Sequence, residues 1–178
     1  MTTIDMETLV QAARAATSDV FATMLALHLE QEQPFADQSP PNPAEGVVSL
    51  IGLAGAWVGT GSLSCSASLA CRIAASMLMA ESPAVNGEVL DVFAEVTNMI
   101  VGNIKTVLEE RLGPLGLSIP TVVYGKNFAT RSASQSQWTV VPFRCGQERL
   151  TVSICLAPSR PPHLPMRPGF TQSYTIRG

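Results

Sequence analysis

The amino-acid sequence predicts an α+β fold for this 178-residue chain. Two observations carry the prediction. The expected elements follow one another as helix, two strands, two helices and three strands, and strands adjoin strands instead of alternating with helices, as a doubly wound parallel sheet would require. The length suits one domain with a substantial core. We expect that domain to span residues 1–156 and a Pro-rich tail to span residues 157–178.

The first half of the chain supplies a helix, a loop and a hairpin. Apolar residues recur at helical spacing over residues 5–29, which predicts one long amphipathic helix. Residues 31–46 contain four prolines that deny the backbone regular pairing, so we expect a loop. Residues 47–53 and 56–64 are typical of two strands, with a tight turn at residues 54–55 between them.

The second half supplies two helices and three strands. Ser66 or Ser68 is expected to cap a helix that runs to about residue 79. After a break at Asn86-Gly87, a longer helix is expected over residues 88–112, ending near Gly113. Alternating or apolar runs rich in Val, Thr and Ile predict strands at residues 119–124, 137–144 and 149–156, the last two forming a hairpin.

Composition excludes several classes of function. Hydrophobic residues make up 46% of the chain and charged residues 14%, with a formal net charge of -3. No dense Lys/Arg face is available for binding nucleic acid. No run of ~18 apolar residues predicts a membrane span, and the first residues lack the basic region of a signal peptide. We therefore expect a cytoplasmic protein, and the high apolar content favours a homodimer with a large buried interface.

Other candidate motifs point to structure more than to chemistry. The glycines of the first hairpin match neither the dinucleotide fingerprint nor the P-loop, and are expected at turns and bulges. His28 and His163 have no neighbouring nucleophile or ligand cluster. The intervals between the cysteines match no zinc motif, so buried thiols are favoured over a disulfide or metal site: Cys65, Cys71, Cys145 and Cys155.

A polar stripe on the third helix is the strongest candidate site. Asp91, Glu95 and Asn98 recur at intervals of four and three residues, which places them on one helix face. Gly102, one turn further, removes bulk where a partner could approach closely. The buried sides are expected to include Phe93, Ala94, Ile100, Val101, Ile104, Val107 and Leu108. A solvated helix face is the alternative interpretation.

The chemistry of the stripe fits assistance to phosphoryl transfer. A carboxamide both accepts and donates hydrogen bonds, so Asn98 can hold a water in line with a phosphorus atom. Positioning and charge stabilisation supply most of the acceleration in such reactions. The sequence contains no Asp-Asp or Asp-x-Asp cluster, so no metal site is expected in this chain. Any Mg²⁺ would come from the substrate protein.

The motif Asp91-x-x-x-Glu95-x-x-Asn98, with Pro120 placed 22 positions after the asparagine, resembles the signature of the CheC/CheX/FliY chemotaxis phosphatases, most closely CheX. The resemblance covers about residues 5–156. Further agreement lies in the first hairpin, directly after the stripe and in the later strands, at residues 50–55, Gly59, residues 102–106, residues 123–126 and residues 141–143.

The resemblance implies a fold, an activity and a partner. The fold is the CheC-like α+β domain, in which an antiparallel sheet packs against long helices. The substrate is the aspartyl-phosphate of a CheY-like response regulator, bound together with the regulator's Mg²⁺. Asn98 would orient the attacking water, Glu95 would pair with the regulator's active-site lysine, and Asp91 would support the helix or the partner contact. CheX-type members act as homodimers.

The sequence also departs from the CheC pattern. CheC-type members carry a second Glu-x-x-Asn motif on the first helix, where this chain has residues 15–23 without it, so one site per subunit is expected. The Pro-rich loop at 31–46 and the tail leave the choice of partner open. A non-catalytic module that binds a receiver domain, or a structural dimer that buries the stripe, remains an alternative to the enzyme.

Overall fold

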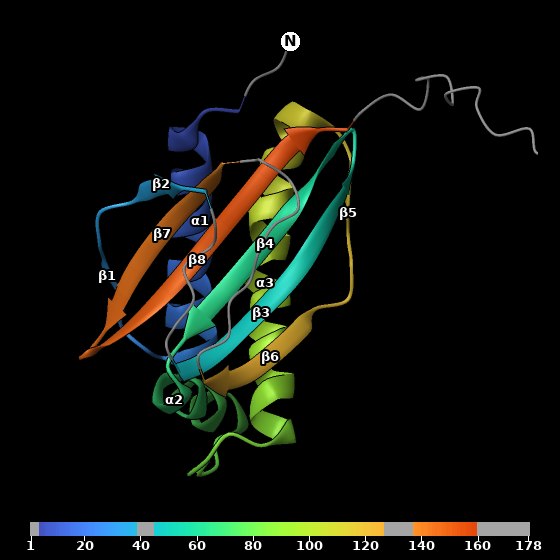
Figure 1. Ribbon diagram of the computed structural model, residues 1–178. Helices are drawn as coiled ribbons and strands as arrows, with labels where there is room; N and C mark the ends of the chain where they lie inside the picture. The colour runs from blue at the N-terminus through green and yellow to red at the C-terminus, as the bar shows by residue number, and fades with distance from the viewer. Residues whose placement is uncertain (1–3, 39–44, 127–136, 160–178) are drawn as a thin grey trace, which may run out of the picture.

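One antiparallel sheet, covered on one face by two long helices, dominates the computed structural model, which describes residues 4–38, 45–126 and 137–159 (Figure 1). The strand order is β1-β7-β8-β4-β3-β5, with β2 also on β7 and β6 also on β3. The strands are β1 (Glu30–Gln31), β2 (Phe35–Asp37), β3 (Glu45–Gly55), β4 (Trp57–Cys65), β5 (Leu115–Leu117), β6 (Thr121–Lys126), β7 (Trp138–Cys145) and β8 (Glu148–Pro158).

The helices lie behind and below the sheet in Figure 1. Helix α1 (Met6–Val20), with a π-helical turn at Phe21–Leu25, runs beside α3 (Gly87–Leu112) on the same face of the sheet. The shorter α2 (Ala67–Leu78) lies at one end and contacts both α3 and β3. This arrangement confirms the predicted α+β class and the predicted antiparallel sheet.

The core lies between the helices and the sheet. Alternate strand residues point to the helices, as the two-residue period of a strand requires. On the sheet side the buried core includes Val47, Ile51, Leu63, Val141, Phe143, Val152 and Ile154. On the helix side it includes Ala13, Val20, Phe93, Ile100, Ile104 and Leu108. Large apolar side chains on both layers fix how α3 sits on the sheet, and therefore which face of α3 remains open.

Two glycines of β4 allow close approach of neighbouring elements. The sequence predicted turn and bulge glycines here, which was wrong for Gly59 and Gly61, because both lie within the paired part of β4. A Cβ atom on Gly61 would lie 2.8 Å from a methyl group of Val101, so α3 can pack this closely only on a glycine. A Cβ atom on Gly59 would overlap the carbonyl oxygen of Cys155 in β8.

The ends of α3 are set by residues that the sequence identified. The Asn86 side chain accepts a hydrogen bond of 3.0 Å from the Val89 N–H, which caps the first turn. At the other end Gly113 adopts a φ of 76°, a conformation that favours glycine. The helix therefore begins within one residue of the predicted start and ends at the predicted Leu112.

Removal of the α3 cap should destabilise the protein. Asn86→Ala leaves the first-turn N–H groups without their side-chain acceptor and is expected to lower the free energy of unfolding by about 1 kcal/mol. Asn103→Ala is the matched control, because Asn103 is exposed within α3, where alanine is the better helix former. Urea unfolding should show opposite signs for the two variants, and equal effects would contradict the capping role.

Several predicted boundaries were wrong. Residues 31–46 are not all loop: β1, β2 and the start of β3 lie there, and the two short strands pair with β7. Two- and three-residue strands are too short to show a period. The first helix ends at Leu25, because Ala26 adopts a left-handed φ of 50°. Leu27, which extended the apparent period, and Leu29, the predicted end of the helix, pack on the core after the helix has ended.

The connection from α3 to β6 also differs from the prediction. Strand β5 was missed, and β6 begins at Thr121, after the predicted start at Ile119. The β3–β4 turn is centred on Ala56, since Leu53 pairs with Gly59, and Gly55 pairs with Leu115. Strand β8 continues to Pro158, two residues past its predicted end. The predicted tail lies outside the described residues from residue 160 onward.

Candidate functional site

The predicted stripe lies on the open face of α3 and lines a cavity. Asp91, Glu95 and Asn98 are all exposed, and all three border an open cavity of about 330 Å³. Ala94 completes the helix wall. The sequence reasoning placed Ala94 on a buried side; it is only half-buried, because it faces this cavity. Spacing along the helix therefore brought the three polar residues together as predicted.

The second wall of the cavity comes from a segment far along the chain. Residues 117–120, which begin at the last residue of β5, supply Leu117, Ser118, Ile119 and Pro120. In Figure 1 this stretch runs along the edge of the sheet between the end of α3 and the start of β6. Pro120 and Asn98, which are joined in the sequence only by their spacing, thus border the same cavity. One wall is polar and the other is mostly apolar.

The polar side chains of the stripe are available to a partner. The structure gives the side chains of Asp91, Glu95 and Asn98 no hydrogen bond or ion pair with any other described residue. Their helix is held from its other sides by buried residues, including Val92, Val96 and the fully buried Thr97. A rigid helix that carries unpaired polar groups into a cavity is a preorganised binding wall.

Gly102 lies one turn beyond Asn98, outside the set of residues that line the cavity. It is half-buried, and a Cβ atom on it would lie 3.9 Å from a methyl group of Leu117, which is ordinary van der Waals contact. Val107, predicted on a buried side, has 47% of its surface exposed. A single exposed valine is common on protein surfaces.

Two charged residues of α3 beyond Gly102 help to hold the chain segment that leads to the second wall. Lys105 and Glu109 form an ion pair of 2.8 Å, and the Glu109 carboxylate also accepts a hydrogen bond of 2.7 Å from the Leu115 N–H. The Leu115 N–H and the Lys105 ammonium together hold the pKa of Glu109 below its ordinary value. The carboxylate therefore remains charged at neutral pH and ties the chain after α3 to the helix.

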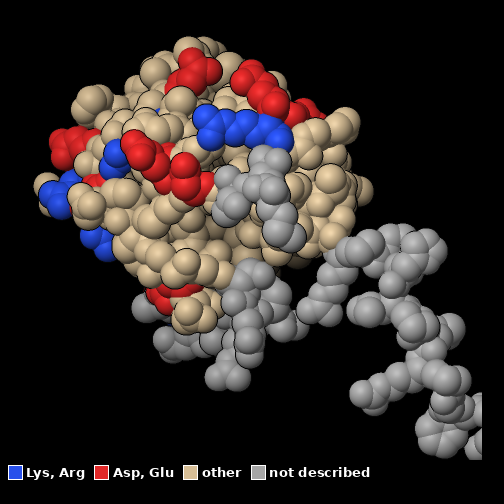
Figure 2. Space-filling model, turned by 90° about the horizontal axis from the view of Figure 1, so that it is seen from above, with Lys and Arg blue, Asp and Glu red and all other residues tan. Residues whose placement is uncertain are grey.

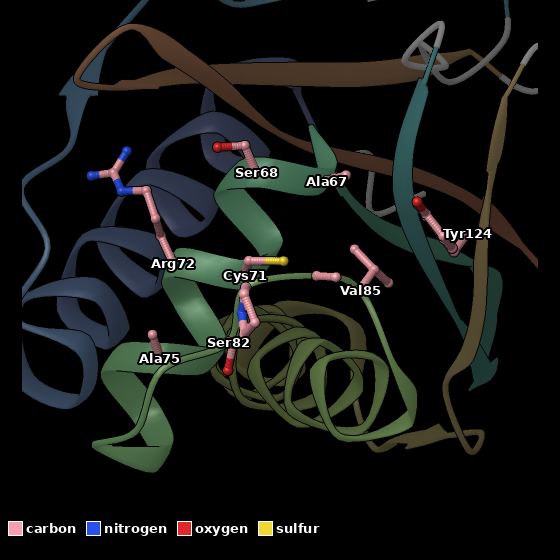
Figure 3. Close-up of a pocket in the computed structure, with 10 residues that line it drawn as sticks. Ala67, Ser68, Cys71, Arg72, Ala75, Ser82, Val85 and Tyr124 are labelled. Atoms are coloured by element: carbon pink, nitrogen blue, oxygen red, sulfur yellow. The ribbon is translucent and has the colours of Figure 1, made fainter.

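A second cavity, of about 490 Å³, lies between α2, residues 82–85 and β6 (Figure 3). The Cys71 thiol points into it, and burial raises the pKa of this thiol, which disfavours the reactive thiolate. Arg72 turns away and forms an ion pair of 3.0 Å with Glu148. Among the described residues, none of the predicted site residues lines this cavity and no charged side chain is aimed into it, so we assign the chemistry to the cavity lined by Asp91, Glu95 and Asn98.

Other candidate chemistry has little support among the described residues. No group of three or more His, Cys, Asp and Glu side chains there could hold a metal ion. Cys65, Cys145 and Cys155 are buried as predicted, whereas Cys71 is half-buried.

On the end of the molecule shown in Figure 2, acidic and basic side chains lie next to one another. No helix in the described part is long and apolar enough to cross a membrane.

The family model of the chemotaxis phosphatase CheX matches residues 47–144, a region that includes both walls of the cavity. The chain belongs to the CheX family. It is therefore a member of a phosphatase family of chemotaxis, and the resemblance of the chain to this family is confirmed. The sequence has no significant match among curated proteins.

Solved structures of CheX and CheC-like proteins share the fold. Chemotaxis protein CheX from Vibrio vulnificus is 28% identical, with a TM-score of 0.73 over 84% of this chain and 99% of that chain. A CheC-like superfamily protein from Shewanella sp. PV-4 is 25% identical, with a TM-score of 0.76 over 84% and 97%. The CheX–CheY–BeF3–Mg²⁺ complex from Borrelia burgdorferi is 23% identical, with a TM-score of 0.71 over 83% and 97%. The fold of this chain is thus CheC-like.

Sequence reasoning missed three residues that line the cavity beside the stripe. Leu117, Ser118 and Ile119 line it, but the sequence placed Ile119 in a strand and assigned no element to Leu117 and Ser118. The only signal for them was their position directly before Pro120, the distant member of the family signature. Periodicity could not identify them, because Leu117 ends a three-residue strand and residues 118–120 have no regular structure.

Proposed function

We propose that this CheX-family protein hydrolyses the aspartyl-phosphate of a CheY-like response regulator in chemotaxis or a related two-component pathway. The observation that carries the proposal is the joint exposure of Glu95 and Asn98 on one wall of a cavity whose other wall contains Pro120. A receiver domain that places its phosphorylated aspartate in this cavity would bring the phosphorus close to the Asn98 carboxamide.

Asn98 is the proposed catalytic residue. Its carboxamide accepts a hydrogen bond from a water and holds the water oxygen in line with the phosphorus. The new bond joins the water oxygen to phosphorus while the bond from phosphorus to the aspartate oxygen breaks. The products are inorganic phosphate and a free carboxylate on the regulator. Because the transition state is loose, orienting the water can account for much of the acceleration.

Glu95 and Asp91 are the proposed partner-binding residues. The Glu95 carboxylate lies one helical turn from Asn98, in reach of a lysine that borders the receiver's phosphorylation site. Asp91, one turn before Glu95, supports the same contact. Gly102, one turn beyond Asn98, leaves space for the partner at the other end of the stripe. The Borrelia complex contains CheY, BeF3 and Mg²⁺ together with CheX, which supports a magnesium ion supplied by the regulator. The reaction at Asn98 then requires no metal ligand from this chain.

Release of inorganic phosphate tests the proposed activity. Each CheY-like receiver of the source genome is phosphorylated with phosphoramidate in Mg²⁺, and a substoichiometric amount of the wild-type protein is added. At least one receiver should lose its phosphoryl group with many turnovers per molecule of this protein. Binding to a phosphorylated receiver without a shortened phosphoryl lifetime would instead identify a non-catalytic receiver-binding module.

Replacement of Glu95 should separate docking from turnover. Glu95→Ala removes a charge-assisted contact to the partner lysine, so KM should rise about tenfold with kcat nearly unchanged. Glu110→Ala is the matched control, because Glu110 is an exposed glutamate of α3 outside the cavity. Steady-state kinetics with phosphorylated receiver measures both constants. A fall in kcat at constant KM for Glu95→Ala would contradict the docking role.

We also infer a homodimer, which the family resemblance implies and the 46% hydrophobic content supports. Light scattering after size exclusion should give about twice the chain mass of 18.9 kDa. The proposed activity requires the stripe, which is exposed in the single chain, to remain accessible in the dimer. Protection of the stripe by dimer formation would favour a purely structural role.

A further inference from the structure

The segment opposite the catalytic stripe, residues 117–120, is held in place by a compact set of hydrogen bonds. The Ser118 N–H donates to the Gly52 carbonyl oxygen at 2.9 Å, and the Gly52 N–H donates to the Ser118 hydroxyl at 2.8 Å. The same hydroxyl donates to the Ile119 carbonyl oxygen at 3.1 Å. Ser118 thus joins the segment to β3 on one side and restrains the next residue on the other.

Ile119 projects from this fixed backbone into solvent. Its exposed fraction is 88%, whereas Leu115, at the start of the same connection, is 5% exposed. Among the large exposed hydrophobic side chains described, only Met79 is more exposed, at 93%. Met79 has a local cause, because it ends α2 in a left-handed conformation with a φ of 52°. Ile119 has no such backbone constraint, so its exposure needs another explanation.

The position of Ile119 supplies that explanation. It lines the same cavity as Glu95 and Asn98, on the opposite wall, where Leu117 and Pro120 are its neighbours. Any protein that brings a phosphorylated side chain to Asn98 must lie against both walls. An isoleucine in that position would lose most of its contact with water on docking, which favours association. A partner with an apolar surface beside its phosphorylation site is therefore favoured over one with a charged surface there.

We propose that Ile119 is a specificity-determining contact for the phosphorylated receiver domain, and that Ser118 is the positioning residue that presents it. The proposal rests on the proposed phosphatase function and adds a second, apolar part to its binding site. The polar wall acts on the phosphoryl group and the lysine, whereas Ile119 recognises the protein surface around them. In this assignment Ile119 contacts the receiver surface and not the reacting atoms, so it should not affect the chemical step once the receiver is bound.

Kinetics of Ile119 and Ser118 variants test this assignment. Ile119→Ala should raise KM for phosphorylated receiver about tenfold while kcat at saturation stays within about twofold of wild type. Met79→Ala is the matched control, since it removes an equally exposed apolar side chain outside the cavity. Ser118→Ala should raise KM in the same direction, and Ser118→Thr, which keeps the hydroxyl, should restore it.

A binding measurement separates failure of this proposal from failure of the proposed function. Each variant is titrated with receiver loaded with beryllofluoride and Mg²⁺, a stable stand-in for the phosphoryl group. Weaker binding by Ile119→Ala, with Met79→Ala unchanged, supports the contact even if wild type releases no phosphate. Wild-type affinity and KM in Ile119→Ala would overturn it, including when Asn98→Ala is inactive as expected. A loss of kcat alone would also overturn it.

Discussion

Asn98→Ala should lower kcat for receiver dephosphorylation about a hundredfold or more, because it leaves the attacking water without its orienting group. Affinity for the receiver should change little, since Glu95 remains in place and Asn98 contributes mainly in the transition state. The exposed position of Asn98 excludes a large effect on folding. Single-turnover decay of the phosphoryl group at saturating protein measures the chemical step directly.

The matched control is Asn103→Ala, which removes an exposed asparagine from the same helix outside the cavity. It should retain wild-type turnover. Asn98→Asp is a sharper comparison, because it keeps the shape of the side chain but replaces the amide donor with a negative charge next to the phosphoryl oxygens. It should be at least as slow as Asn98→Ala. Full activity of either Asn98 variant would remove Asn98 from the mechanism.

Gly59→Ala should be the most destabilising of the glycine-to-alanine changes on the sheet. The added Cβ would overlap the Cys155 carbonyl oxygen, so the β4 and β8 backbones must separate where Gly59 pairs with Leu156. These strands are central in the sheet and cannot yield as a flexible side chain would. We expect a loss of at least about 3 kcal/mol in the free energy of unfolding, which is the upper end of the range observed for substitutions that overpack a protein interior. Urea unfolding by circular dichroism gives the value.

Gly116→Ala provides the opposite expectation at a second strand glycine. A Cβ there would lie 3.6 Å from the Ala54 carbonyl oxygen, an ordinary contact, and Gly116 is without a positive φ. The variant should stabilise the protein by about 0.4–1 kcal/mol, because alanine lowers the conformational entropy of the unfolded chain. If both variants were equally destabilising, the cost would be common to strand glycines and would not come from the close approach of β4 and β8 at Gly59.

The helix that carries the site could be predicted because its signals are local. Apolar spacing, the Asn86 cap and Gly113 all lie within or next to α3, and the stripe follows from helical geometry alone. The face that remains open was also predictable in outline, although Ala94 and Val107 were misplaced. Their exposure depends on which parts of α3 the sheet and α1 cover, and helical period does not determine that.

The second wall could not be derived from local sequence. Ser118 and Gly52 are joined by hydrogen bonds although 66 residues separate them, and β5 exists only through pairing with β3. Pro120 was linked to Asn98 by family resemblance, whereas the cavity that contains both is a tertiary feature. Strands β1 and β2 were missed for the same reason, since β7 induces pairing in a segment with no period of its own.

A structure of this protein bound to a receiver loaded with beryllofluoride and Mg²⁺ tests the central claim most directly. The decisive measurement is the distance from the Asn98 carboxamide to the beryllofluoride group. We predict that the group lies in the cavity between α3 and residues 117–120, one water molecule away from Asn98, with Glu95 paired to the receiver lysine. A receiver bound elsewhere, with Asn98 facing only solvent, would contradict the assignment of this cavity as the catalytic site.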